Sequence, residues 1–200
     1  CPYLDQLMTL VAGKLTWLLM IVALVWITVR KGWRQALVVV VALALTILIA
    51  DRVASGLIKP WVERLRPTHD PVIGGTLHVI DGYRGGTYGF VSSHAANTLG
   101  AALLMMLFLK NRWASLALAL WVSLVCYCRM YQGVHYPGDI LGGLLVGAAA
   151  AIAVYALWRG LSRRHQALTV TFTDGEGKAL ATAILLNILI LCIIAAFPLP

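Results

Sequence analysis

Six long apolar stretches, separated by polar turns, dominate this sequence. They cover residues 15–29, 35–58, 95–109, 113–128, 140–158 and 179–197. A helix needs about 20 apolar residues to cross the hydrocarbon of a bilayer, and flanking Trp, Lys and Arg side chains extend the reach of a shorter one. Because a helix satisfies its own backbone polar groups in lipid, all six stretches are predicted to be transmembrane helices.

The composition agrees with a protein embedded in a membrane. Of the 200 residues, 60% are hydrophobic and only 12% are charged, whereas a soluble domain is about half apolar and about a quarter charged. We therefore predict an all-α integral membrane bundle of six transmembrane helices, in one domain covering residues 1–200, with a short interfacial helix at residues 1–13. The net charge of +8 comes without a basic run interleaved with aromatic residues, so no nucleic-acid partner is expected.

The cysteines and the N-terminal residues add three negative expectations. Three of the four cysteines lie in apolar stretches and none forms a CxxC pair, so neither a disulfide framework nor a cysteine metal site is predicted. A basic segment followed by an apolar segment and a small-residue cleavage site is not seen near residue 1, so no signal peptide is predicted.

The distribution of basic residues predicts the orientation in the membrane. Nine of the sixteen Lys and Arg residues lie in the turns after the first, third and fifth stretches: Arg30, Lys31, Arg34, Lys110, Arg112, Arg159, Arg163, Arg164 and Lys178. Lys and Arg prefer the cytoplasmic side, so these turns are expected to face the cytoplasm. The loop 59–93, the turn 129–139 and both ends of the chain then lie on the outer side.

Three polar segments share that outer side. In "KPWVERLRP" (59–67), Lys59 and Arg66 are seven residues apart, and a helix would present both on one face. In "GFVSSHAANT" (89–98), Ser92 is a candidate N-cap. The free N–H groups of Ser93 and His94 would then form an anion cradle at the positive end of the next helix.

The third segment is "CRMYQGVHYPGD" (128–139). Pro137 suits the first turn of a helix, with His135 just before it and Asp139 just inside. With Lys59, Arg66 and Arg129, the three segments combine fixed cations, two histidines and one carboxylate, which suits them to handling a phosphate. One histidine could attack phosphorus while a carboxylate holds its far nitrogen, and the other could protonate the leaving oxygen. No carboxylate cluster suggests a metal, so no metal or other cofactor is expected.

These segments resemble the motifs KxxxxxxRP, PSGH and SRxxxxxHxxxD of the phosphatidic acid phosphatase type 2 superfamily. Lys59 through Pro67 match the first motif, Val91–His94 the second with Val and Ser for its Pro and Gly, and Cys128–Asp139 the third with Cys for its Ser. The resemblance implies a catalytic core at residues 51–158, with His135 as nucleophile, Asp139 orienting it and His94 as general acid. It also implies that the phosphate is bound by Lys59, Arg66, Ser92, Ser93 and Arg129.

The family resemblance implies metal-independent removal of phosphate from a membrane lipid through a phosphohistidine, at the periplasmic or outer face of a bacterial inner membrane. The loop 68–91 is a predicted lid in which Tyr83 and Arg84 contact the head group; Arg84 would meet a second phosphate, which favours undecaprenyl diphosphate. The alternatives are a lipid A phosphatase, a phosphatidylglycerol phosphate phosphatase and a lipid phosphotransferase. A metal-dependent phosphatase is a further alternative, and a non-catalytic, anion-binding membrane transporter is the rival from a different class.

Three expectations concern residues outside these motifs. Asp51 and Arg52 are either a support for Lys59 or a mutually satisfied pair. Gly142, Gly143 and Gly147 indicate close helix packing. Residues 161–178 predict an inward-facing turn with a small hairpin.

Overall fold

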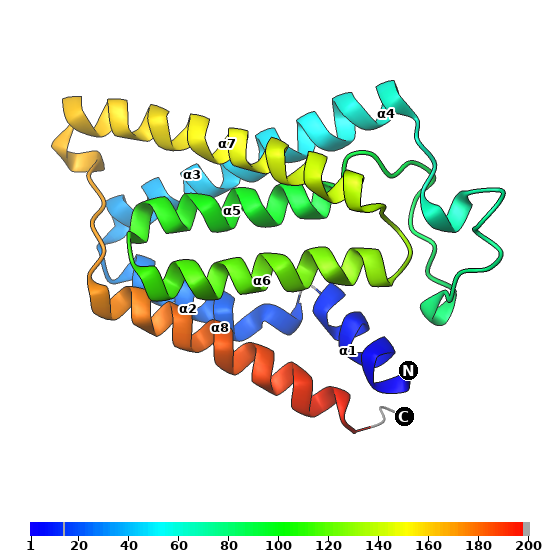
Figure 1. Cartoon of the computed structure of the whole chain (residues 1–200). Coiled ribbons are helices and arrows are strands. Elements are labelled where there is room, and N and C mark those ends of the chain that lie inside the picture. Colours follow the sequence, from blue (N-terminus) through cyan, green and yellow to red (C-terminus); the bar gives the residue numbers. More distant parts are fainter. Residues whose placement is uncertain (14, 198–200) are drawn as a thin grey trace.

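The computed structural model describes residues 1–13 and 15–197. All regular elements in these ranges are helical. The helices are α1 (Pro2–Ala12), α2 (Leu18–Val29), α3 (Trp33–Asp51), α4 (Lys59–Val62), α5 (Ser93–Leu109), α6 (Arg112–Tyr131), α7 (Pro137–Arg164) and α8 (Asp174–Ala195). A π-helix, Arg52–Ile58, joins α3 to α4, and short 3₁₀ turns lie at Leu15–Trp17, Pro67–His69, Ile80–Gly82 and Gln166–Leu168. The long helices lie side by side, and the loop between α4 and α5 projects from one end (Figure 1).

The described residues contain four helices that are long and apolar enough to cross a membrane: Trp33–Val62, Arg112–Tyr131, Pro137–Arg164 and Asp174–Ala195. A fifth is reached if α1 and Leu15–Val29, which meet at 80°, are counted as one bent span. The chain thus has the several apolar helices of an integral membrane protein, but six spans are not confirmed. α5 has 17 residues, fewer than the approximately 20 that a span needs, and it packs between α3, α6 and α7.

Glycines bring α5 and α7 unusually close. A Cβ on Gly143 would lie 2.3 Å from the Ser92 carbonyl oxygen, and one on Gly147 would lie 2.2 Å from that of Ala96. At Gly142 a Cβ would lie 2.5 Å from the side chain of Val91. The predicted close packing is confirmed, and it fixes the start of α5 against the first turns of α7.

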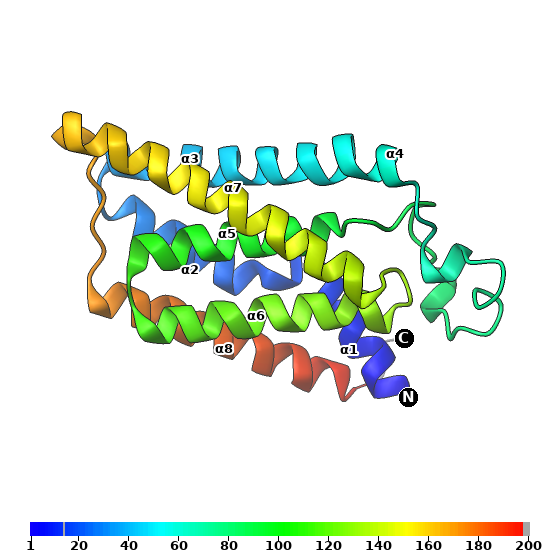
Figure 2. The same ribbon diagram turned by 45° about the horizontal axis from the view of Figure 1, so that its top comes forward.

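The N-terminal segment forms a helix, α1, that packs against α6 and α8 through Leu7, Met8 and Val11. It lies at the same end of the molecule as the loop between α4 and α5, as Figure 2 also shows. This end carries the polar segments singled out in the sequence.

The hairpin predicted within residues 161–178 is wrong. This fully described segment contains the end of α7, a 3₁₀ turn at Gln166–Leu168 and the start of α8, with no strand. Thr173 and Glu176 form a reciprocal capping box that begins α8, and the backbone groups it satisfies favour a helix over a strand. Glu176 also pairs with Lys31, 2.6 Å away, which ties α8 to the turn before α3.

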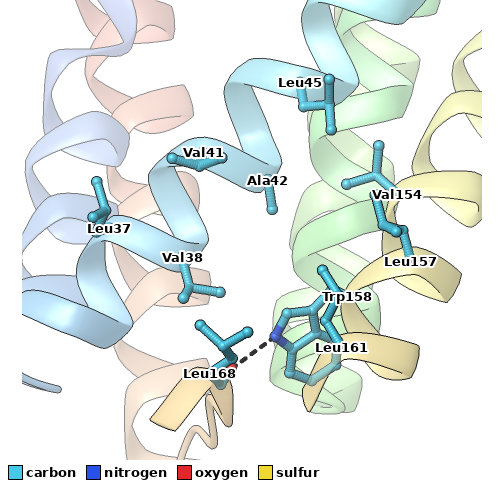
Figure 3. A pocket seen from close by; sticks show the side chains of 10 residues that line it. All are labelled: Leu37, Val38, Val41, Ala42, Leu45, Val154, Leu157, Trp158, Leu161 and Leu168. Carbon is cyan, nitrogen blue, oxygen red and sulfur yellow. Dashed lines mark hydrogen bonds between the residues drawn. The ribbon is translucent and has the colours of Figure 1, made fainter. Parts of the chain in front are cut away.

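At the end of the bundle opposite the polar segments, α3 and α7 line an apolar hollow of about 280 Å³ (Figure 3). Its walls include Val38, Leu45 and Trp158, and the indole of Trp158 donates a hydrogen bond to the Leu168 carbonyl oxygen at 3.0 Å. The lining side chains, apart from that indole N–H, are hydrocarbon. The hollow therefore offers nothing to bind or transform a polar group.

Candidate active site

The polar segments meet where α4 ends and where α5 and α7 begin (Figure 1). His135 contacts residues of two of these segments and is 3% exposed. Its Nδ1 lies 3.4 Å from Oδ2 of Asp139, and its Nε2 lies 3.3 Å from a guanidinium nitrogen of Arg66. One ring nitrogen therefore faces a carboxylate while the other faces a cation that can grip phosphate.

Local sequence holds Asp139 in this place. α7 begins at Pro137, as predicted, and the backbone N–H of Tyr136 donates to Oδ2 of Asp139 at 2.8 Å. This is the helix-start geometry in which a third-position carboxylate reaches back to the cap residue. Asp139 is fully buried, so a charged partner is needed to offset its desolvation.

That partner is Arg64, which was not among the predicted site residues. Its guanidinium forms an ion pair with Oδ1 of Asp139 and lies over the rings of Phe90 and Tyr136, at 4.8 and 5.3 Å from their centroids. Cation–π contacts of this kind hold a guanidinium in one orientation. His135, Asp139 and Arg64 thus form a chain of three charged or titratable groups.

The prediction that Lys59 and Arg66 share a helix face is wrong. α4 ends at Val62, because Glu63 takes a left-handed conformation with φ of 51°. The next residues run extended, and the backbone of Arg66 donates to Thr87. In an extended segment, residues two apart lie on the same side. The alternation of Arg64, Leu65 and Arg66 was the signal that could have placed both arginines beside α7.

The start of α5 is built as expected. The Ser92 hydroxyl accepts from the N–H of Ala95 at 3.4 Å, so Ser92 is the N-cap. Its own N–H donates to the Asp139 carbonyl oxygen at 2.9 Å, which joins the starts of α5 and α7. The Lys59 ammonium donates to the Val91 carbonyl oxygen at 2.5 Å. Lys59 therefore lies directly beside the chain that enters α5.

Asp51 supports this region through hydrogen bonds, not through Arg52. Ser55 donates to Asp51 at 3.2 Å and shares a hydrogen bond of 2.7 Å with Ser93. Asn97 also donates to Asp51, at 3.4 Å. Arg52 is exposed and makes no ion pair with its neighbour. The structure thus connects Asp51 to Ser93, a link that neither expectation included.

Arg129 and His94 face a cavity of about 350 Å³. Arg129 is 3% exposed, makes no ion pair within the described residues, and its Nε has no hydrogen-bond partner there. The His94 side chain is exposed at the same cavity. A buried cation without a counter-charge is unfavourable, so this arrangement suits an anionic ligand.

Tyr83 and Arg84, the two residues predicted to contact the head group, differ in whether they line this cavity. Tyr83 lines the same cavity. Arg84 does not; its guanidinium donates to the Thr68 carbonyl oxygen at 2.9 Å, and its own carbonyl oxygen accepts from the Thr68 hydroxyl at 2.8 Å. Arg84 is thus engaged in closing the loop.

The electrostatics favour a neutral imidazole at His135. Burial lowers the pKa of His135, and the nearby cations Arg66 and Lys59 lower it further, against the opposing effect of the Asp139 carboxylate. A neutral ring has a free lone pair on one nitrogen. With Asp139 beside Nδ1, that lone pair belongs on Nε2, the nitrogen next to Arg66.

Comparison with known proteins agrees with this inventory. Residues 35–163 match the PAP2 superfamily. The lipid A 4'-phosphatase of Bacteroides thetaiotaomicron is 35% identical over 88% of this chain and 79% of its own length. That of Porphyromonas gingivalis is 36% identical over 78% of the chain and 67% of its own length.

Phosphatidylglycerophosphatase B of Bacillus subtilis is more distant, at 24% identity over 73% of the chain and 71% of its own length. No solved structure matches the chain. The extent and identity of these matches show that the chain belongs to the PAP2 superfamily. It is a membrane lipid phosphatase of that family.

Proposed function

We propose that the protein hydrolyses a phosphate monoester of lipid A, through a phosphohistidine formed on His135. The observation that carries this proposal is the position of His135, with Asp139 at one ring nitrogen and Arg66 at the other. The similarity to two lipid A 4'-phosphatases over most of the chain supports the lipid. It favours the lipid A alternative over undecaprenyl diphosphate, the substrate that the sequence first suggested.

The first half of the reaction forms the covalent intermediate. Lys59, Arg66, Arg129 and the N–H groups at the start of α5 bind the phosphate oxygens and stabilise charge in the transition state. Nε2 of His135 attacks phosphorus in line, and the bond between phosphorus and the sugar oxygen breaks. His94 gives its proton to that oxygen, so the dephosphorylated lipid leaves as an alcohol.

The second half returns the enzyme to its starting state. His94, now neutral, takes a proton from a water molecule as that water attacks the phosphohistidine. The bond between nitrogen and phosphorus breaks, inorganic phosphate leaves, and His135 is neutral again. Asp139 holds the ring in the productive tautomer throughout and offsets the positive charge on the phosphorylated imidazole. These steps use no metal ion or other cofactor.

The site favours one phosphate over two. A diphosphate brings a second group of negative charges, which needs further cations beyond those on the first phosphate. Arg84, the predicted second anchor, does not line the cavity that Arg129 and His94 face. Arg129 is the one Lys or Arg side chain among the described residues that line the cavity.

The proposal includes the location of the reaction. Because Lys and Arg crowd the turns at the opposite end of the bundle, the site faces outward, toward the periplasm of a bacterial inner membrane. Residues 51–158 form the catalytic core. For the predicted six spans, α2 and α5 would also cross the membrane.

Phosphate release from a panel of lipids tests the proposal. Purified protein in detergent is given bisphosphorylated lipid A, undecaprenyl diphosphate and phosphatidic acid, and the position of the phosphate lost from lipid A is found by mass spectrometry. We expect loss of a sugar phosphate from lipid A and none with His135→Ala. His165→Ala, at an exposed histidine near the opposite end, is the matched control and should retain activity.

Two outcomes would contradict the proposal. Release from undecaprenyl diphosphate alone would return the substrate to the diphosphate class. Full activity of His135→Ala would remove the covalent mechanism. With isotopically labelled phosphate, appearance of label in a second lipid instead of in inorganic phosphate would identify a transferase.

A further inference from the structure

A second cavity adjoins the one that holds Arg129 and His94. It has a volume of about 330 Å³ and shares Thr9, Ile80 and Asp81 with the first. Together they make a groove that runs from Arg129 and His94 along α1. We call this the α1 groove and define it by its polar lining: Asp5, Gln6, Thr9, Asp81, Tyr83 and Gln132.

Gln132 is the most informative residue in this groove. It lies three residues after Arg129, one helical turn on, and lines the same cavity. It is 5% exposed, and its side-chain carbonyl oxygen has no hydrogen-bond partner among the described residues. Burying an amide oxygen without a partner costs free energy, so native proteins normally pair such atoms. A ligand hydroxyl or amide in the cavity would supply the missing donor.

The rest of the groove matches the chemistry of Gln132. Its polar groups are amides, a hydroxyl, a phenol and two carboxylates, all of which bond to hydroxyls. Asp5 is held in position, because its Oδ1 accepts from Tyr131 at 2.9 Å and faces His78 at 3.1 Å. Asp81 is exposed beside it, in the 3₁₀ turn Ile80–Gly82. Two carboxylates would repel a second phosphate, whereas they accept hydrogen bonds from sugar hydroxyls.

We propose that the α1 groove binds the sugar part of the leaving group, an uncharged, hydroxylated glucosamine unit that carries the scissile phosphate. This inference rests on the proposed function and adds the means by which the enzyme selects its lipid. A diacylglycerol leaving group has ester oxygens and no hydroxyl donors for Gln132 or Asp81. The groove therefore distinguishes a phosphorylated sugar from a phosphorylated glycerol next to the same phosphate site.

The test compares kcat/KM for lipid A and for phosphatidic acid in each variant. Gln132→Leu removes the buried amide. It should lower kcat/KM for lipid A at least about ten-fold more than kcat/KM for phosphatidic acid, because a site that hydrogen-bonds substrate hydroxyls discriminates through those bonds. Tyr83→Ala removes a side chain that is 45% exposed, so it should leave core packing intact. Like Gln132→Leu, it should lower the ratio of kcat/KM for lipid A to kcat/KM for phosphatidic acid. Tyr127→Ala is the matched control, because Tyr127 is 48% exposed and does not line the groove.

Each outcome decides between the two proposals. If the wild-type protein acts on lipid A but neither Gln132→Leu nor Tyr83→Ala changes the ratio of the two kcat/KM values, the sugar subsite is overturned and the proposed function stands. Wild-type activity on phosphatidic acid without any on lipid A would overturn the proposed function and the subsite together. A shifted ratio in both variants, but not in Tyr127→Ala, would support the subsite.

Discussion

Arg64 provides the sharpest test of how the site is organised. It contacts Asp139 but is not expected to touch the phosphate, so we expect it to act on the proposed reaction through Asp139 and His135. Replacing it with alanine leaves a buried carboxylate with only the Tyr136 N–H and the His135 ring beside it. We expect the histidine to lose part of its fixed orientation and the carboxylate to attract water or the ring more strongly.

The structure sets the size of this effect. Breaking a fully buried ion pair costs about 3–5 kcal/mol, whereas an exposed pair contributes about 0–1 kcal/mol. The Asp139 side chain is 0% exposed and that of Arg64 is 40% exposed, so the pair lies between these limits. We take about 1–3 kcal/mol, which corresponds to a loss of roughly 5- to 150-fold in rate if all of it falls on the transition state.

Steady-state kinetics on lipid A would measure this loss. We expect kcat to fall while KM changes little, because the cations proposed to bind phosphate remain. Arg64→Lys should be intermediate, since it keeps the charge but loses the planar group that stacks on Phe90 and Tyr136. Arg163→Ala, at an exposed arginine in the last turn of α7, is the control for loss of one positive charge.

The pH dependence separates positioning from a merely structural role. The Asp139 carboxylate raises the pKa of His135, and Arg64 offsets that negative charge. Without Arg64 the pKa of His135 should rise, so the acid limb of kcat/KM should move to higher pH. The reasoning is refuted if Arg64→Ala and Arg163→Ala have equal kcat, or if the loss appears wholly in KM with an unmoved pH profile.

Gly147→Ala should destabilise the fold, because its Cβ would lie 2.2 Å from the Ala96 carbonyl oxygen; we expect about 1–3 kcal/mol from overpacking. Gly160→Ala, in the same helix, should be neutral or stabilising, because beyond its chain neighbours and its own helix backbone an added Cβ would meet no atom of the described residues within 4 Å. Equal thermal shifts in detergent for the two variants would argue against close helix packing. In the wild-type enzyme, burial and the neighbouring cations lower the pKa of His135, so the neutral nucleophile persists as pH falls. The acid limb of kcat/KM should then lie below the ordinary histidine pKa of about 6.5, and a limb above it would contradict this. A chelator should leave phosphate release unchanged, whereas loss of activity restored by Mg²⁺ would indicate a metal-dependent reaction.

The sequence by itself determined the features that depend on neighbouring residues. The apolar stretches predicted helices, Ser92 predicted the start of α5, and Pro137 predicted the start of α7; all three are local effects of side chains on nearby backbone groups. The order of polar segments at helix ends was also the basis for predicting a phosphate site, which stays a prediction. The capping box at Thr173 and Glu176 was equally local, and that signal would have excluded the hairpin.

Only the tertiary structure decided which distant groups meet. Arg64 and Asp139 are 75 residues apart. Their pairing depends on the left-handed residue Glu63 that follows α4 and on how the next loop returns to α7. The α1 groove likewise joins the first helix to residues 80–83 and 132, a contact that no spacing along the chain could indicate. Local rules act over about one helical turn, whereas these contacts are selected by the packing of whole helices, which depends on the complete set of side chains at once.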